Sequence, residues 1–236
     1  MTTFRATFIE KVRRTPGVVS FRFRPERDPG FRPGQFCQLI FDEQDPRNRE
    51  LNKYLSLSCA PDKPYIEVTK RLSDSAFSQR LTALEEGQSI LIGGPMGTCT
   101  YEDGLRRIGF LIGGIGITPV ISILEYIVQR GLDTDVCLLY SNRTMDDVAF
   151  KPELDAWSQA HAGIAVTYLA PDCPAERADC LNGLIDHDAI VRRMSDYRDR
   201  TIYVFGPPVM VKAMAELCRN EGASPEQIRT ENFVGY

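Results

Sequence analysis

The length, composition and charge of the chain restrict what it can be. Its 236 residues suit one large domain or two small ones, and a hydrophobic content of 43% is enough for packed cores and excludes a disordered chain. The formal net charge of −4 gives no general basic surface, so we do not expect nucleic-acid binding. No apolar run reaches the roughly 18 residues that a membrane span needs. Residues 1–10 lack the layout of a signal peptide, so we expect a cytoplasmic protein.

The first hundred residues show six short strand patterns separated by turn signals such as Pro16-Gly17 and Pro33-Gly34. One helix pattern, at about Ala76–Leu84, interrupts them. The combination predicts a small antiparallel β-barrel. The expected strands are Arg5–Val12, Val18–Arg24, Phe36–Phe41, Tyr54–Ser58, Tyr65–Lys70 and Ser89–Gly93.

After Asp103-Gly104 the pattern changes to alternating strands and helices, which predicts a parallel sheet covered on both faces. We therefore expect two domains, residues 1–103 and residues 104–236. The expected strands of the second domain are Arg107–Ile112, Asp135–Ser141, Gly163–Ala170 and Thr201–Phe205. Its expected helices are Pro119–Arg130, Lys151–Ala160, Asp186–Met194 and Pro208–Glu221.

The seven cysteines do not follow a metal-binding pattern. None forms a Cys-x-x-Cys pair, and His161 and His187 are the only histidines in the chain, so we expect neither an iron–sulfur cluster nor a zinc site. The cysteines lie mostly in apolar strand or helix patterns, so we expect reduced, buried thiols.

A glycine-rich turn is the sharpest local signal. Residues 111–119 read Leu-Ile-Gly-Gly-Ile-Gly-Ile-Thr-Pro, follow a predicted strand and open a predicted helix. Glycines let the backbone approach a pyrophosphate, and a helix N-terminus supplies free amide groups and a positive dipole. We expect Thr118 to cap the helix and Pro119 to lie in its first turn. A purely structural strand-to-helix turn would fit the same pattern.

Two further segments have the composition of binding loops. Residues 205–210, Phe-Gly-Pro-Pro-Val-Met, join a strand to a helix, and in a parallel sheet such loops lie at the carboxyl edge, where ligands bind. Residues 53–61, Lys-Tyr-Leu-Ser-Leu-Ser-Cys-Ala-Pro, combine a cation with alternating hydroxyl and apolar side chains. Taken alone, the first fits a simple helix start and the second a simple barrel strand.

Together and in this order, these segments resemble the ferredoxin–NADP reductase-like family of flavoprotein reductases. Four further stretches are similar to that family: residues 31–36 (Phe-Arg-Pro-Gly-Gln-Phe), 94–97 (Gly-Pro-Met-Gly), 140–143 (Tyr-Ser-Asn-Arg) and 231–233 (Glu-Asn-Phe). The resemblance covers nearly the whole chain. It implies an N-terminal antiparallel β-barrel that binds FAD, followed by an α/β Rossmann-like parallel sheet that binds NAD(P)H.

The resemblance implies a flavin site in the barrel. The family's Arg-x-Tyr-Ser motif falls on Lys53, Leu55 and Ser56. Lys53 would meet a phosphate of FAD as a point charge, Leu55 would pack against the ring, and Ser56 would lie near flavin N5 and tune it. Tyr54 would point to the other face of the strand. Ser75 stands where the family has the glycine of a Gly-x-x-Ser turn. The remaining flavin-binding candidates are Thr69, Lys70, Ser75, Phe77 and Ser78.

The resemblance also implies a dinucleotide site in the second domain. The family's Cys-Gly-Pro turn becomes Phe205-Gly206-Pro207, so Phe205 would make the nicotinamide pocket bulkier. Phe233 and Tyr236 are candidates to cover the flavin face where nicotinamide stacks; alternatively, Phe233 closes the last strand and Tyr236 is a frayed end. The dinucleotide-binding candidates are Gly113, Gly114, Gly116, Ile117, Thr118, Asn142, Arg143, Gly206, Pro207 and Met210.

The reaction that the resemblance implies is hydride transfer from nicotinamide C4 to flavin N5, without an obligatory side-chain proton donor. Arg143 follows the second strand and suits a 2′-phosphate, but Asp146 and Asp147 would repel one, so we favour NADH over NADPH. The electrons would pass to a separate ferredoxin, oxygenase component or other redox protein. Two alternatives stay open: a diffusible reductase of free flavin, and a non-catalytic flavin-binding subunit of a larger complex.

Overall fold

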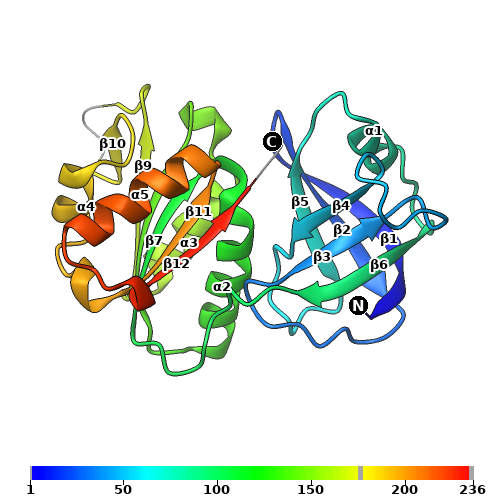
Figure 1. The fold of residues 1–236 in the computed structure, drawn as a ribbon, viewed down its shortest axis with the longest axis horizontal. Coiled ribbons are helices and arrows are strands. Elements are labelled where there is room, and N and C mark those ends of the chain that lie inside the picture. Colours follow the sequence, from blue (N-terminus) through cyan, green and yellow to red (C-terminus); the bar gives the residue numbers. More distant parts are fainter. Residues whose placement is uncertain (1, 175–177, 234–236) are drawn as a thin grey trace. The chain divides into compact units, whose positions relative to one another are not determined.

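The chain folds into two compact units, each built on a six-stranded sheet (Figure 1). The computed structural model describes residues 2–174 and 178–233. The first unit takes the chain as far as Tyr101 together with Thr118–Tyr126, and the second takes Glu102–Ile117 and the chain from Ile127 onward. Within the described residues, no helix is long and apolar enough to span a membrane.

An antiparallel barrel makes up most of the first unit. Its elements are β1 (Thr3–Thr15), β2 (Val18–Pro25), β3 (Phe36–Ile40), β4 (Asn52–Ser56), β5 (Ile66–Arg71), α1 (Ala76–Thr82) and β6 (Ser89–Met96). The strands pair in the order β4-β3-β6-β1-β2-β5. Leu57, directly after β4, forms an antiparallel bridge with Val68 of β5, so the two edge strands meet and close the sheet. This confirms the barrel that the sequence predicts.

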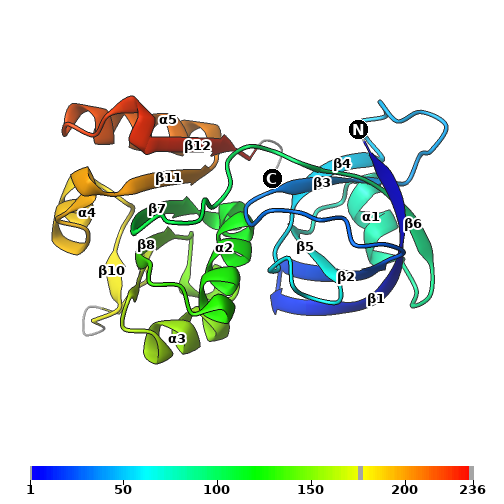
Figure 2. The same cartoon turned by 90° about the horizontal axis from the view of Figure 1, so that it is seen from below.

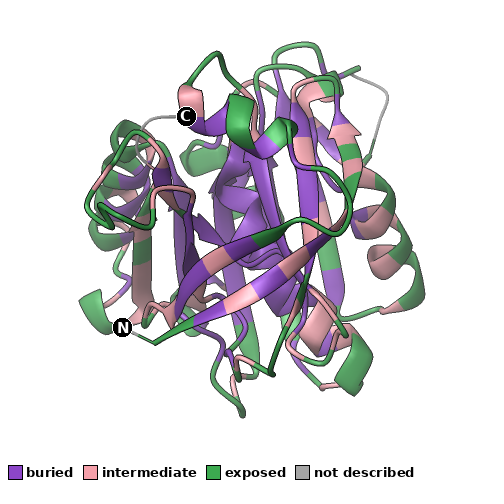
Figure 3. Ribbon diagram, turned by 90° about the vertical axis from the view of Figure 1, so that its right-hand side faces the viewer, coloured by how far each residue is buried: buried purple, intermediate pink, exposed green. Residues whose placement is uncertain are grey.

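Buried residues alternate with less buried ones along strands of the barrel (Figure 3), and the apolar side chains among the buried residues fill its interior. Phe4, Ala6 and Phe8 of β1 are buried together with Phe21 and Phe23 of β2, and all five belong to one core cluster. The rings of Phe8 and Phe23 meet edge to face, with centroids 5.5 Å apart. Burial of such aromatic side chains stabilises each by roughly 2 kcal/mol.

A buried ion-pair network surrounds Glu67 of β5, a carboxylate whose side chain is only 2% exposed. Glu67 Oε2 lies 3.0 Å from Nη2 of Arg14 and 2.8 Å from Nε of Arg22. The hydroxyl of Ser58 donates to Glu67 Oε1 at 3.0 Å, and its oxygen also lies 2.7 Å from Oγ1 of Thr69. Two guanidinium groups and a hydroxyl therefore compensate one buried charge.

A parallel sheet makes up the second unit, as the alternating pattern predicts. Its strands are β7 (Arg107–Gly113), β8 (Asp135–Ser141), β9 (Ile164–Ala170), β10 (Cys180–Asn182), β11 (Thr201–Gly206) and β12 (Ile228–Asn232), in the order β10-β9-β8-β7-β11-β12. The helices that alternate with these strands are α2 (Ile117–Arg130), whose residues Thr118–Tyr126 belong to the first unit, α3 (Lys151–Ala160), α4 (His187–Arg193) and α5 (Pro208–Asn220). A 3-10 turn, η2 (Met145–Asp147), follows β8.

Helices cover both faces of this sheet. Figure 2 shows α4 and α5 on one side of the strands and α3 on the other. On the α4–α5 side, Ile190 and Met194 of α4 and Val211 and Met214 of α5 join a core cluster with Leu111 of β7. The strands read as apolar runs because they are buried on both faces.

Two strands are absent from those expected for the second domain, although one alternative for Phe233 assumes a last strand before it. β10 contains only three residues, which is too short to show a period. β12 reads Ile-Arg-Thr-Glu-Asn, and this largely polar segment becomes a strand because it pairs in parallel with β11 at the sheet edge. Pairing with a distant neighbour, rather than local preference, decides both strands.

The expected cap of α2 is wrong. A 3-10 turn, η1 (Gly114–Gly116), runs directly into the helix, so the helix begins at Ile117 and Gly116 takes the N-cap position. Thr118 therefore lies inside the first turn, where its side chain is 1% exposed. The helix begins two residues earlier than its Thr-Pro signal predicts.

The expectation of seven reduced cysteines is wrong for two of them. Cys173 and Cys180 form a disulfide, because the chain turns back from β9 to β10 and brings their Cα atoms to 6.1 Å. The five free cysteines are Cys37, Cys59, Cys99, Cys137 and Cys218. Burial raises the pKa of Cys37 to about 12 and that of Cys137 and Cys218 to about 11, so these thiols stay protonated.

Candidate functional site

The carboxyl edge of the parallel sheet carries most of the predicted dinucleotide-binding residues. The order in which parallel strands are added to the sheet reverses between β7 and β11: β8 and β9 follow β7 on one side, and β11 and β12 lie on the other. In open α/β sheets, ligands bind outside the carboxyl ends of the strands at such a reversal. The glycine turn after β7, Asn142 and Arg143 after β8, and Gly206 and Pro207 at the end of β11 all lie at this edge.

The three glycines after β7 have different surroundings. Gly114 has φ +53°, and a Cβ placed there would meet no atom within 4 Å. A Cβ at Gly116 would lie 2.6 Å from the carbonyl oxygen of Phe205, and a Cβ at Gly113 would collide with Sδ of Met210. Glycine is therefore required at position 116, where the obstructing atoms are backbone, while at position 113 the obstructing atom is the end of a flexible side chain. Gly114, in contrast, borders open space that a ligand can occupy.

The turns after β7 and β11 interlock. Pro207 and Met210 both approach Gly113, so the structure brings these three predicted residues together. Phe205, which the resemblance places near a nicotinamide, is 0% exposed and packs edge to face on Tyr203 at 5.7 Å between centroids. Its side chain contributes to the core of the second unit, and its backbone determines how closely Gly116 approaches.

Asn142 is a polar side chain that the fold leaves unsatisfied. It follows β8 and is 6% exposed, yet neither Nδ2 nor Oδ1 has a hydrogen-bond partner among the described residues. Buried amides are almost always hydrogen-bonded, and an orphan pair costs a few kcal/mol unless a ligand or water completes it. A donor and an acceptor at the carboxyl edge fit the polar groups of a dinucleotide. The neighbouring Arg143 is exposed.

The end of β12 adds a carboxyl group to this edge. Glu231 pairs in register with Phe205, and burial raises the pKa of Glu231 to about 7. Glu231 belongs to the segment 231–233 that resembles the reductase family, but the sequence predicts no role for its side chain. Its partial burial arises only when β12 pairs with β11, which the sequence pattern does not reveal. The backbone N–H of Phe233 donates to the carbonyl of Gly206 at 2.9 Å. Tyr236 lies outside the described residues.

A pair of lysines marks the candidate flavin site in the barrel. Lys70 of β5 is 5% exposed, and its pKa is lowered, first by burial and then by the charge of Lys53 on β4. A buried ammonium group beside a second cation favours an anion in its vicinity. A flavin nucleotide phosphate is such an anion, so these two residues fit the group that the resemblance implies.

The other flavin-binding candidates of the barrel lie in different surroundings: some are in the core, one is on the surface, and others form hydrogen bonds within the protein. Leu55 and Phe77 belong to the barrel core cluster, and Ser56 is 5% exposed. Tyr54 is 53% exposed and packs on Phe36, so it points away from the Leu55 side, as strand alternation predicts. The hydroxyl oxygen of Thr69 lies 2.7 Å from those of Ser20 and Ser58.

The serines before α1 bond to one another. Ser75 is the N-cap of α1, and its side chain accepts from the backbone N–H of Ser78 at 3.3 Å. The hydroxyl of Ser78 is 3.1 Å from that of Ser75, and the side chain of Ser78 is 1% exposed. Both serines therefore stabilise the helix start.

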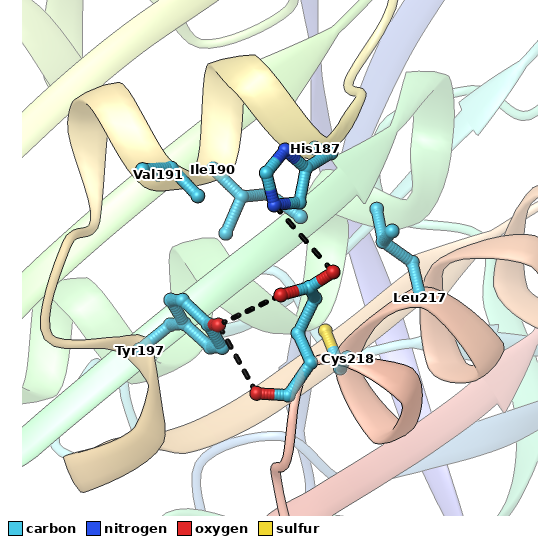
Figure 4. A pocket seen from close by; sticks show the side chains of 7 residues that line it. His187, Ile190, Val191, Tyr197, Leu217 and Cys218 are labelled. Carbon is cyan, nitrogen blue, oxygen red and sulfur yellow. Dashed lines mark hydrogen bonds and ion pairs between the residues drawn. The ribbon is translucent and has the colours of Figure 1, made fainter.

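A groove between α4 and α5 contains none of the predicted residues (Figure 4). Apolar side chains line it together with His187, Tyr197 and Glu221. His187 Nε2 lies 3.5 Å from Glu221 Oε1, and the phenol of Tyr197 donates to the carbonyl of Glu221 at 3.1 Å. A hydrogen bond to Asp188 and the charge of Glu221 raise the pKa of His187. These contacts hold α4 against the end of α5.

Metal chemistry has no visible site in the described part of the chain. No group of three or more His, Cys, Asp or Glu side chains there is arranged to hold a metal ion.

The chain is similar to known reductases in sequence and in structure. Residues 110–216 match the oxidoreductase NAD-binding domain. The chain is 34% identical to NADH nitrate reductase of Ulva prolifera over 149 residues, which cover 58% of this chain and 17% of that protein. It is 29% identical to NADH-cytochrome b5 reductase 1 of Dictyostelium discoideum over 181 residues, covering 75% and 63%. It thus spans less than two thirds of either relative.

A solved structure extends the likeness to the whole chain. The ferredoxin NADP+ reductase of Neisseria gonorrhoeae with bound FAD and NADP superposes with a TM-score of 0.80, at 21% identity, covering 98% of this chain and 99% of that one. The likeness shows the same fold, a barrel followed by a parallel α/β sheet. The chain thus contains an oxidoreductase NAD-binding domain at residues 110–216 and has the two-domain fold of this ferredoxin reductase.

Proposed function

We propose that the protein is an FAD-dependent oxidoreductase that takes a hydride from NAD(P)H and passes electrons to a separate acceptor. The observation that carries the proposal is the carboxyl edge of the parallel sheet. There, Gly114 borders open space and Asn142 holds an unsatisfied amide, within the segment that matches the oxidoreductase NAD-binding domain. The two named relatives are both NADH-dependent reductases, which supports the same activity.

In this proposal, residues 104–236 bind the dinucleotide. The backbone at Gly114, where a Cβ would meet open space, is the part of this turn that a pyrophosphate approaches, and Ile117 and Thr118 support it from the start of α2. The N–H of Ile117 itself donates to the carbonyl of Gly114 within the turn. Gly113 and Gly116 support this turn by letting the loop after β11 approach closely. The amide of Asn142 completes its hydrogen bonds on the ligand, and Arg143, Gly206, Pro207 and Met210 lie at the same edge of the sheet.

Residues 1–103 bind FAD in the same proposal. When bound, the flavin supplies an acceptor for the hydride of a reduced nicotinamide and a donor to the next carrier. Lys53 and Lys70 hold the phosphate charge, which relieves the repulsion between the two cations. Ser56 keeps a hydroxyl on the strand that carries Lys53, and the remaining barrel candidates shape the surroundings. Phe233 and Tyr236 stay predictions for the aromatic cover of the flavin.

The acceptor in this proposal is a redox protein, and the site of action is the cytoplasm, where nicotinamide dinucleotides are available. Cytochrome b5 appears in the name of one relative and ferredoxin in the name of the structural neighbour. Reduction of an added cytochrome b5 and of an added ferredoxin by the protein with NADH or NADPH tests which kind of acceptor it uses. Cell fractionation tests the location.

The visible spectrum of the purified full-length chain tests the function. We expect flavin absorption bands that bleach when reduced nicotinamide dinucleotide is added without oxygen. A colourless protein that reduces added flavin would instead identify a diffusible flavin reductase. Bound flavin that neither NADH nor NADPH bleaches would contradict the proposed reductase activity and support a non-catalytic flavin-binding subunit.

A further inference from the structure

The turn after β8 determines which dinucleotide fits the proposed site. In dinucleotide-binding sheets, residues at the carboxyl end of the second strand contact the adenosine ribose. An acidic residue there accepts from the 2′-hydroxyl of NAD, whereas an arginine accommodates the 2′-phosphate of NADP. In this chain the second strand is β8, and the turn contains Arg143, Thr144 and the 3-10 turn η2.

Carboxylates already engage two hydrogen-bond donors of this turn. The backbone N–H of Met145 donates to both oxygens of Asp172, at 2.9 Å to Oδ1 and 3.2 Å to Oδ2. Asp172 follows β9, so a neighbouring strand supplies this acceptor. The hydroxyl of Thr144 donates to Oδ2 of Asp147 at 3.2 Å. A backbone N–H and a hydroxyl, both suited to hold a phosphate, therefore face carboxylates instead.

The charge of the turn also disfavours a 2′-phosphate. Asp146 is exposed beside Asp147, and Asp172 contacts the backbone of Met145, the residue before Asp146. Three carboxylates therefore lie in or against residues 143–147, whose one cationic side chain is Arg143. A 2′-phosphate carries a charge of about −1.5 to −2 at neutral pH. Such a group would meet net negative charge and would have to displace Asp172 or Asp147 to gain their donors.

The neighbouring Asn142 is a second observation that points to a ligand at this turn. Its buried amide has an unsatisfied donor and an unsatisfied acceptor among the described residues, directly before Arg143. A neutral ribose hydroxyl both donates and accepts, so it can satisfy an amide without adding charge.

We propose that Asp172, together with Asp147, makes this site specific for the dinucleotide without a 2′-phosphate, so that NADH is the hydride donor. The proposal rests on the function proposed above and names its substrate. Asp172 acts by occupying the N–H of Met145 and by repelling a phosphate.

Binding of the adenosine half tests the proposal without flavin or turnover. The full-length protein is titrated by calorimetry with ADP-ribose and with 2′-phospho-ADP-ribose, and kcat/KM is measured with NADH and NADPH. We expect both readouts to favour the unphosphorylated form by at least about tenfold. Because the discrimination is partly electrostatic, it should shrink as ionic strength rises.

Asp172→Asn and Asp147→Asn remove one charge each, and Asp133→Asn is the matched control. The side chain of Asp133 is 96% exposed and lies in the turn before β8, at the opposite end of that strand. We expect either of the first two variants to bind the 2′-phosphorylated probe more tightly, by about tenfold, while the control matches the wild type.

Different results would refute the NADH specificity and the proposed reductase function. If the wild-type protein binds both probes equally, or prefers the phosphorylated one, the specificity assignment is refuted while the reductase function stands. If it binds neither probe and neither dinucleotide supports turnover, the proposed function itself fails. A control variant that changes discrimination as much as Asp172→Asn would show that overall charge, rather than this turn, is responsible.

Discussion

Replacing Gly116 by alanine should destabilise the second unit far more than the same change at Gly114, two residues earlier. A Cβ at position 116 would lie 2.6 Å from the carbonyl oxygen and 2.7 Å from the carbonyl carbon of Phe205, and 3.0 Å from the backbone nitrogen of Gly206. Ordinary contacts of a Cβ lie at 3.4–4 Å, so the backbones must separate by several tenths of an ångström. No flexible side chain can absorb this movement, because the obstructing atoms belong to the main chain of β11.

The expected cost follows from the position of the clash. Overpacking a well-packed core costs about 1–3 kcal/mol, and β11 pairs on both sides, with β7 and β12. We therefore expect Gly116→Ala to lower the free energy of unfolding by about 3 kcal/mol. Gly114→Ala meets no atom within 4 Å, and its cost is the left-handed conformation alone, about 1 kcal/mol.

Urea denaturation followed by far-ultraviolet circular dichroism measures both variants against the wild type. We expect a clearly larger drop in the urea midpoint for Gly116→Ala than for Gly114→Ala, with unchanged slopes. An equal or smaller drop than for Gly114→Ala would refute it and would show that β11 can move away at little cost.

Four further substitutions are expected to have separate effects. Glu67→Gln removes the buried carboxylate that Arg14 and Arg22 share, although Arg22 keeps its ion pair with Glu10, and should lower the free energy of unfolding by about 3 kcal/mol in urea denaturation; an unchanged midpoint would show that the ion pairs of Glu67 add nothing to stability. Because burial raises the pKa of Glu231 from 4.5 to about 7, wild-type stability should fall as pH rises through that interval, and Glu231→Gln should abolish the fall in thermal melts. Lys70→Met should lower the FAD content of the purified protein, unlike Lys70→Arg, which keeps the charge; equal loss in both would point to packing. Gly114→Glu should raise KM for the dinucleotide and leave bound flavin unchanged, and an unaltered KM would remove the glycine turn from the site.

The sequence predicts the elements whose signals are local. The strands around Gly113 and Phe205 are continuous apolar runs ended by glycine, and the helices that follow them have a clear period, so both their type and their order can be read directly. The barrel follows in the same way from short strands separated by turn signals.

The features that the sequence does not predict depend on residues that are distant in the chain. β12 is a strand because of its pairing with β11, and the disulfide forms because β10 returns beside β9. The glycine pattern alone cannot show that Gly116 is needed for the backbone of Phe205 while Gly114 borders open space. The unsatisfied amide of Asn142 likewise appears only when all its neighbours are in place.

The way the barrel closes has a consequence for how it keeps its shape. Between its two edge strands, the structure shows one bridge, Leu57 to Val68, and one backbone hydrogen bond, from Ser58 to Glu67. Lys53 lies on one of these strands and Lys70 on the other, so their mutual repulsion acts across the seam. An anion bound between the two ammonium groups would attract both of them and so hold the two edge strands together. Amide hydrogen exchange along this seam would then slow when FAD is bound, more than on the side of the barrel where β1 and β2 pair over most of their length.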